Sequence, residues 1–388
     1  MRPVLQIIGA LLLAGVGWSA DSAPGELLDQ VRAKVLANAQ RVPRYTCRQT
    51  VTRTEYRPQY GGVPDSCRAL IAARDSLTSP GLILWHDRLR LDVAILDGRE
   101  TFSWAGGSSF ETNDIHELIA AGSTGSGTFA SFLTQVFGLR ETQIAFLGGD
   151  LFGFRVPEAV SGYQYRSHGT GAEKKSGFHG TLEIDAARAD IRRMVLDADE
   201  FPRDEPTCRV RDEMNYHRVK MGAGDFLLPE TARMTVLFRS GKESQNETRY
   251  SECREYVGES TIRFNDEAEA PGTDKPVKQA AKFPAGVKLE LVLQPAVHSE
   301  TAAAGDAITA VVRKGPHAGD IAHGRIVRFE QSLFPLPKWT LAMKFDAMEH
   351  NGVMQPVDLR PTKGDTFTFG ERGNIVLNEK FRSEWESR

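Results

Sequence analysis

The chain has 388 residues, a formal net charge of −3, 40% hydrophobic residues and 26% charged residues. This composition is typical of a globular protein with apolar cores, and the length favours two or three domains. A nucleic-acid-binding domain carries a basic patch or an excess of basic residues. Neither is visible among 48 basic and 51 acidic residues, so we expect no nucleic-acid partner.

Residues 1–20 have the layout of a secretory signal peptide. Arg2 supplies a basic start, an apolar run covers 4–16, and small residues lead up to Ala20. The run is shorter than the roughly 20 residues that a membrane span needs, and a retained anchor is the alternative. We therefore expect the protein to be exported to the periplasm or the medium, and not to be an integral membrane protein after cleavage.

Two disulfides are expected, because the number of cysteines is even and the predicted compartment is oxidising. No two cysteines are spaced as C-x-x-C, which argues against a redox site or a zinc ribbon. The pairing stays open. The pairing local in sequence joins Cys47 to Cys67 and Cys208 to Cys253, whereas Cys47–Cys253 follows if the first and last strands of one sheet are neighbours.

Apolar spacing predicts a helix over residues 25–41 and then strands over 45–56, 83–95 and 100–104. The β pattern stops at 114–137, where short helices are expected. The strands predicted after this interruption are short and evenly spaced, which is typical of an antiparallel sheet or barrel. They cover 144–147, 152–156, 162–166, 180–184, 194–198, 208–219, 231–239 and 248–257.

Residues 266–282 are polar or small and are expected to be a linker. A second group of strands follows within 283–388, with apolar and polar residues alternating in 287–293 and 339–346. This part of the chain is therefore expected to be a second β domain with a polar tail.

The order of segments in residues 25–265 is distinctive. An amphipathic helix precedes DRLRLDV (87–93), a helical interruption (114–137), GTLEID (180–185), RRMVLDAD (192–199), MNYHRV (214–219), FLLPE (226–230) and YSECREY (250–256). This order resembles the periplasmic lipoprotein-localisation factor and the related sigma-factor-regulator sensors, and envelope proteins of unknown function from acidobacterial-type bacteria. The resemblance implies a curled, open antiparallel sheet with a concave face.

The segments FPAGVKLELVLQPAV (283–297), SETAAAGDAITAVV (299–312) and IAHGRIV (321–327) follow another order: an apolar strand, a Gly-Asp turn, a strand and a strand led by glycine. They resemble the small β-barrel of the conjugative type IV secretion core component. The resemblance implies a small barrel that acts at the cell envelope.

The predicted fold is therefore mainly β. We expect a curled open antiparallel sheet or half-barrel with an N-terminal helix and a helical plug near 114–137, all within 21–265. A linker (266–282) and a small C-terminal β-barrel with its tail (283–388) follow.

Aromatic and methionine side chains on the predicted strands and helices are candidates to line one cavity between sheet and plug. The alternative is that they form an ordinary packed core. These residues are Phe102, Trp104, Phe129, Phe132, Met214, Tyr216, Met234 and Phe238.

No residues are predicted to be catalytic, to bind a metal or to bind a cofactor. The chain has no G-x-S-x-G, and Ser126 lies in a glycine-rich loop. The motif His317-x-x-Asp320-x-x-His323 is the one compact set of metal-ligand spacing, and it is interpreted as an exposed polar loop.

Two further features are interpreted as structural. His86, beside Asp87, is expected to begin a strand, and adjacent residues alone do not make a triad. The carboxylate pairs Asp212/Glu213 and Asp199/Glu200 are expected to be solvated at the surface.

The leading hypothesis is a non-enzymatic envelope protein that binds an apolar ligand, either a lipid or a lipoprotein acyl chain, in the concave face. One alternative is a scaffold or sensor that acts through an envelope protein partner. The other is a secreted hydrolase without a recognisable motif.

Overall fold

The computed structural model describes residues 24–58, 62–96, 99–107, 110–119, 122–125, 131–256 and 283–388. The predicted signal peptide (1–20) and the predicted linker (266–282) lie outside the described residues, as do Ser126 and Phe129. Within the described ranges, no helix is both long and apolar enough to cross a membrane.

The described part of residues 24–256 contains one open antiparallel sheet of ten strands. Its order is β3-β2-β1-β12-β11-β10-β9-β8-β5-β4. The bounds are β1 (Tyr45–Arg57), β2 (Leu82–Leu96), β3 (Arg99–Trp104), β4 (Gln143–Gly148), β5 (Leu151–Val156), β8 (Phe178–Asp185), β9 (Asp190–Ala198), β10 (Thr207–Met221), β11 (Gly224–Phe238) and β12 (Glu243–Glu255). The short strands β6 (Gln164–Arg166) and β7 (Glu173–Lys175) form a separate ribbon.

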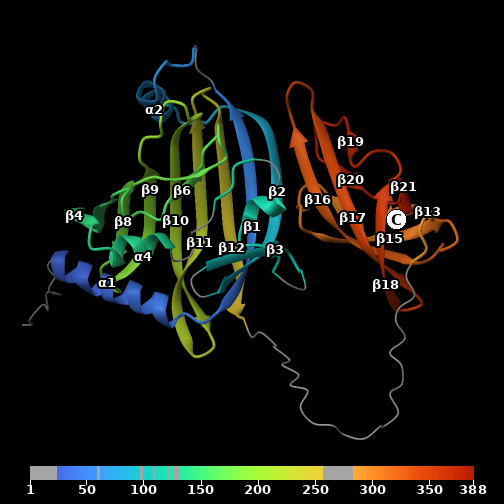
Figure 1. The fold of residues 1–388 in the computed structure, drawn as a ribbon, viewed down its shortest axis with the longest axis horizontal. Coiled ribbons are helices and arrows are strands. Elements are labelled where there is room, and N and C mark those ends of the chain that lie inside the picture. The colour runs from blue at the N-terminus through green and yellow to red at the C-terminus, as the bar shows by residue number, and fades with distance from the viewer. Residues whose placement is uncertain are drawn as a thin grey trace, which may run out of the picture.

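Helices cover the concave face of this sheet. Helix α1 (Pro24–Arg41) lies across one end of the sheet (Figure 1) and buries Leu27, Val31 and Val35, which are spaced four residues apart on one face. These side chains pack with α4 (Ser131–Gly138) and with residues of β5 and β8 to β11 in one core. A second core lies beneath α3 (Ile115–Leu118), mainly on β1, β2 and β3.

Six of the remaining described strands form a closed barrel. Each of β13 (Lys288–Leu293), β15 (Ala307–Lys314), β16 (Ile321–Ser332), β17 (Lys338–His350), β18 (Val353–Pro361) and β21 (Arg382–Ser387) pairs with the next, and β21 returns to β13. Its core is centred on Phe345 and Trp385, whose rings meet edge to face at 4.9 Å. The short strands β14 (Val297–His298), β19 (Phe367–Phe369) and β20 (Val376–Leu377) flank the barrel. The prediction of a curled sheet with a helical plug and a small barrel is confirmed.

The disulfides follow the pairing expected if the first and last strands of one sheet are neighbours. Cys47 on β1 is bonded to Cys253 on the adjacent strand β12, and Cys67 is bonded to Cys208. The sequence-local pairing is therefore wrong. Cys67 begins helix α2 (Cys67–Asp75), which the sequence analysis did not predict, and Ser66 caps this helix by accepting a hydrogen bond from the amide of Ala69.

The sheet and the barrel are hydrogen-bonded to each other and stand side by side (Figure 1). The start of β2 pairs with the end of β16, with His86 opposite Gln331 and Asp87 opposite Glu330. His86 Nε2 lies 2.8 Å from Gln331 Oε1, and its ring meets Trp339 edge to face. His86 therefore belongs to the junction between the two units.

Candidate functional site

A cavity of about 480 Å³ lies between the concave face of the sheet and the segments that cover it. Its floor is built from β1, β12, β11 and β10. Its cover is built from α3, residues 122–125, the first turn of α4 and the segment 162–166. Small-molecule sites in proteins range over roughly 300–1,000 Å³, so the cavity is large enough for a ligand.

One row of side chains crosses the floor from strand to strand. The register places Asp87 opposite Arg53, Arg53 opposite Asn246, Asn246 opposite Met234, and Met234 opposite Asp212. Directly paired residues in a sheet project from the same face. We call these five residues the polar row, because four of them carry charged or amide groups in the concave interior.

Arg53 and Asp87 form a buried ion pair at one end of the polar row. Arg53 Nε and Nη2 donate to the two carboxylate oxygens at 2.9 and 2.5 Å, and the two side chains are 4% and 7% exposed. Burial raises the pKa of Asp87, although the hydrogen bonds from Arg53 oppose that rise. The guanidinium also lies 5.2 Å from the ring centre of Trp85.

Asp212 lies at the other end of the polar row and has no such partner. It is 9% exposed, and no described residue donates a hydrogen bond to its carboxyl group. Burial, and to a smaller extent the carboxylate of Asp197, raise the pKa of Asp212 to about 7. The expectation that Asp212 is solvated is therefore wrong. It lies between Val210 and Met214 on the face of β10 that points inward.

Gln49 and Asn246 add two further acceptors to the cavity, and each is 5% exposed. Asn246 Nδ2 donates to the carbonyl of Ser123 at 2.7 Å. Asn246 Oδ1 and Gln49 Oε1 are buried and accept no hydrogen bond from the described part of the chain. Buried polar atoms are normally hydrogen-bonded. Three acceptor side chains therefore border the cavity with oxygen atoms that lack a donor among the described residues.

The segment 122–125 rests directly on the polar row. A Cβ on Gly122 would lie 2.6 Å from Arg53 Nη1, and one on Gly125 would lie 2.9 Å from Met234 Sδ. Thr124 Oγ1 lies 3.1 Å from His116 Nδ1 and links this segment to α3. Glycine at 122 and 125 lets the cover approach the floor this closely.

Aromatic rings border the cavity near α4. Phe132 stacks on Tyr163 with ring centres 6.1 Å apart, and it meets Phe178 edge to face at 5.7 Å. Burial, together with the nearby carboxyl of Asp212, raises the pKa of Tyr163 well above its usual value. The cavity therefore has apolar walls beside its three acceptors.

Only some of the eight predicted cavity residues line the cavity in the structure. Phe132, Met234 and Phe238 line the cavity. The others that the structure describes are packed in the two cores: Met214 and Tyr216 in the core beneath α1 and α4, and Phe102 and Trp104 in the core beneath α3. A Cβ on Gly305 would lie 2.9 Å from Trp104 Cε3, so this indole also packs toward the junction with the barrel.

The sequence analysis missed Gln49, Asn246 and Asp212. The signal for Asp212 was present, because the alternation that groups Val210 with Met214 also includes position 212. The same alternation places Gln49 between Cys47 and Val51 on β1, and Asn246 on one face of β12 with Thr248 and Tyr250.

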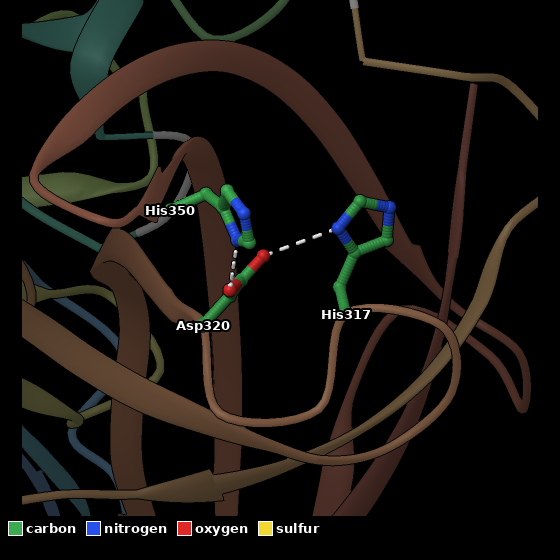
Figure 2. A group of neighbouring side chains, drawn as sticks. All are labelled: His317, Asp320 and His350. Atoms are coloured by element: carbon green, nitrogen blue, oxygen red, sulfur yellow. Dashed lines mark hydrogen bonds and ion pairs between the residues drawn. The ribbon is translucent and has the colours of Figure 1, made fainter.

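The predicted spacing His317-x-x-Asp320-x-x-His323 is only partly assembled. His317 and Asp320 are joined by His350 (Figure 2), and His323 instead pairs with Glu349 at 2.9 Å. Asp320 and His323 are three residues apart along an extended chain, so they point to opposite faces. Within the described ranges, His317, Asp320 and His350 are the group able to hold a metal ion.

Comparison of this chain with protein-family models, with curated proteins and with solved structures gives no match.

Proposed function

We propose that this protein binds an amphiphilic small molecule in the concave cavity of its sheet, with no chemical turnover. The apolar part of the ligand, such as an acyl or alkyl chain, contacts Phe132, Met234 and Phe238. Its polar end donates hydrogen bonds to Asp212, Asn246 and Gln49. The observation that carries the proposal is the set of three buried acceptors, beside an apolar wall, for which the described part of the chain supplies no donor.

The energetics favour a ligand that has both an apolar chain and a polar end. Each buried CH₂ contributes about 0.8 kcal/mol, so a chain of several carbons supplies the main driving force. A hydrogen bond to an acceptor that otherwise stays unsatisfied removes a penalty of about 1–3 kcal/mol. The acceptors therefore select ligands whose polar end is an amine, a hydroxyl or an amide, and disfavour an ionised carboxylate beside Asp212.

The proposed setting is outside the cytoplasm. The two disulfides, Cys47–Cys253 and Cys67–Cys208, fit an oxidising compartment. Together with the signal-like start of the sequence, they support export to the periplasm or the medium.

Two ligands of equal chain length test the proposal. Dodecylamine and dodecanoate, each below its critical micelle concentration, are titrated into the disulfide-bonded protein by calorimetry. We expect dodecylamine to bind, and dodecanoate to bind about ten-fold more weakly or more, because only the amine donates hydrogen bonds to the three acceptors.

Two variants test whether the ligand binds in the cavity. Ala232 lines the cavity on β11, and Ala232→Trp fills part of it. Thr235 lies on the opposite face of the same strand, so Thr235→Trp is the matched control. We expect dodecylamine affinity to fall about ten-fold or more in Ala232→Trp and to stay unchanged in Thr235→Trp. Equal affinity in both variants, or equal affinity for both ligands, would contradict the proposal.

A further inference from the structure

We propose that His317, Asp320 and His350 form a binding site for a divalent transition-metal ion at the end of the barrel sheet, with Zn²⁺ as the first ion to test. Figure 2 shows the carboxylate of Asp320 between the two imidazole rings. Asp320 Oδ2 lies 3.1 Å from His317 Nδ1, and Oδ1 lies 2.6 Å from His350 Nδ1. One ligand atom from each residue lies within 4.8 Å of the others.

The barrel strands bring these residues together. Ile321 on β16 is paired with Glu349 on β17, and one further step of this register puts Asp320 opposite His350. His317 comes from the turn between β15 and β16, where the amide of Asp320 donates to the carbonyl of His317 at 3.1 Å. A Cβ on Gly315 would lie 2.8 Å from the carbonyl oxygen of Lys288, so this turn is packed against β13.

Charge balance favours a cation at this position. Asp320 is 7% exposed, and His317 and His350 are its ion-pair partners in the described part of the chain, with no Lys or Arg among them. An isolated buried carboxylate is costly, so its charge needs compensation. A divalent ion held between the Asp320 carboxylate and the two imidazole rings supplies that compensation.

The donor set suits a borderline metal such as zinc. Zinc binds imidazole nitrogen at about 2.0–2.1 Å and carboxylate oxygen at about 2.0–2.2 Å. In tetrahedral coordination at these lengths, two ligand atoms are about 3.3 Å apart. The present N–O separations of 3.1 and 2.6 Å need only small outward movements to reach this value.

The surroundings hold both rings in place. Phe283, which is 5% exposed, lies against His317 with ring centres 4.7 Å apart. Asn351 Nδ2 lies 2.9 Å from His350 Nε2, on the side of the ring away from Asp320. Such outer contacts orient metal-binding histidines. Three protein ligands leave at least one coordination position for water or another small ligand.

Calorimetric titration of the chelator-treated, disulfide-bonded protein with Zn²⁺ near neutral pH tests this site. We expect one zinc ion per chain in the wild type and a loss of affinity of at least about ten-fold in Asp320→Asn and His350→Gln. His323→Gln is the matched control, because His323 lies three residues from Asp320, on β16, and pairs with Glu349 instead. The control is expected to bind zinc as the wild type does.

Cobalt provides a second readout. Co²⁺ at this site should give visible absorption bands that disappear in His350→Gln and persist in His323→Gln. If Asp320→Asn fails to fold, His350→Gln still decides the question, because the His350 side chain is 55% exposed. Zinc binding that is the same in His350→Gln and in the wild type would overturn the proposal. So would the absence of 1:1 binding.

Discussion

At the residue scale, Asp212 and His350 show which features of the sites are readable from sequence. The period of two in β10 already assigned Val210, Met214 and Tyr216 to one face, and Asp212 belongs to that face by the same rule. Its neighbour Glu213 gave the segment a charged appearance that suggested solvent. His350 is 30 residues from Asp320, and its place depends on the register of β16 and β17, which a single sequence does not encode locally.

The raised pKa of Asp212 makes the stability of the fold depend on pH. The ordinary value of 3.8 applies to the unfolded chain, and the folded value is about 7. The native state therefore binds the proton more tightly, and this group's contribution to the free energy of unfolding falls as pH rises from about 4 to about 7. Asp212→Asn removes this loss, because the amide stays neutral.

We expect Asp212→Asn to match the wild type near pH 4 and to be more stable near pH 8 by at most about 4 kcal/mol. Denaturant unfolding at both pH values measures the difference. A stability difference that does not change with pH would show that Asp212 is ionised throughout this range.

At the scale of elements, most strands and the helical interruption follow from hydrophobic period, but their contacts do not. The predicted strand 83–95 corresponds to β2 (Leu82–Leu96), and the interruption at 114–137 contains α3 and α4. Helix α2 was missed because a Gly/Pro break precedes it and its length is only 9 residues. The glycines at 122 and 125 predicted a loop, and the structure adds the reason: the loop is packed on Arg53 and Met234.

Gly122→Ala tests whether this packing is needed. Gly122 has φ +85°, and the added Cβ would also lie 2.6 Å from Arg53 Nη1. Gly106 has φ +71° with no atom within 4 Å of an added Cβ, so Gly106→Ala carries the backbone cost alone. We expect Gly106→Ala to lower the free energy of unfolding by about 1 kcal/mol and Gly122→Ala by about 1–3 kcal/mol more.

The difference between these two glycine variants in thermal or denaturant unfolding isolates the contact between the cover and the polar row. Limited proteolysis should also cleave the cover faster in Gly122→Ala than in Gly106→Ala. Equal stability and equal cleavage in the two variants would mean that the segment 122–125 does not rest on Arg53.

At the scale of the whole molecule, the sequence indicated two β units but not their joint sheet. The pairing of β2 with β16 links residues more than 240 positions apart, and edge pairing of this kind leaves no local pattern. It also extends the polar row, because Glu330 of the barrel lies opposite Asp87, which binds Arg53 beside the cover. The barrel and the cavity are therefore connected through adjacent positions of one sheet.

The most direct test of the account is native mass spectrometry of the disulfide-bonded protein, purified without detergent from cells that produce it, followed by solvent extraction. We expect a discrete bound mass of an amphiphile with an amine, hydroxyl or amide at its polar end. The same mass should be retained by Thr235→Trp and lost from Ala232→Trp. Protein that carries no bound molecule, with only the sequence mass less four hydrogens for the two disulfides, would contradict ligand binding in the concave cavity.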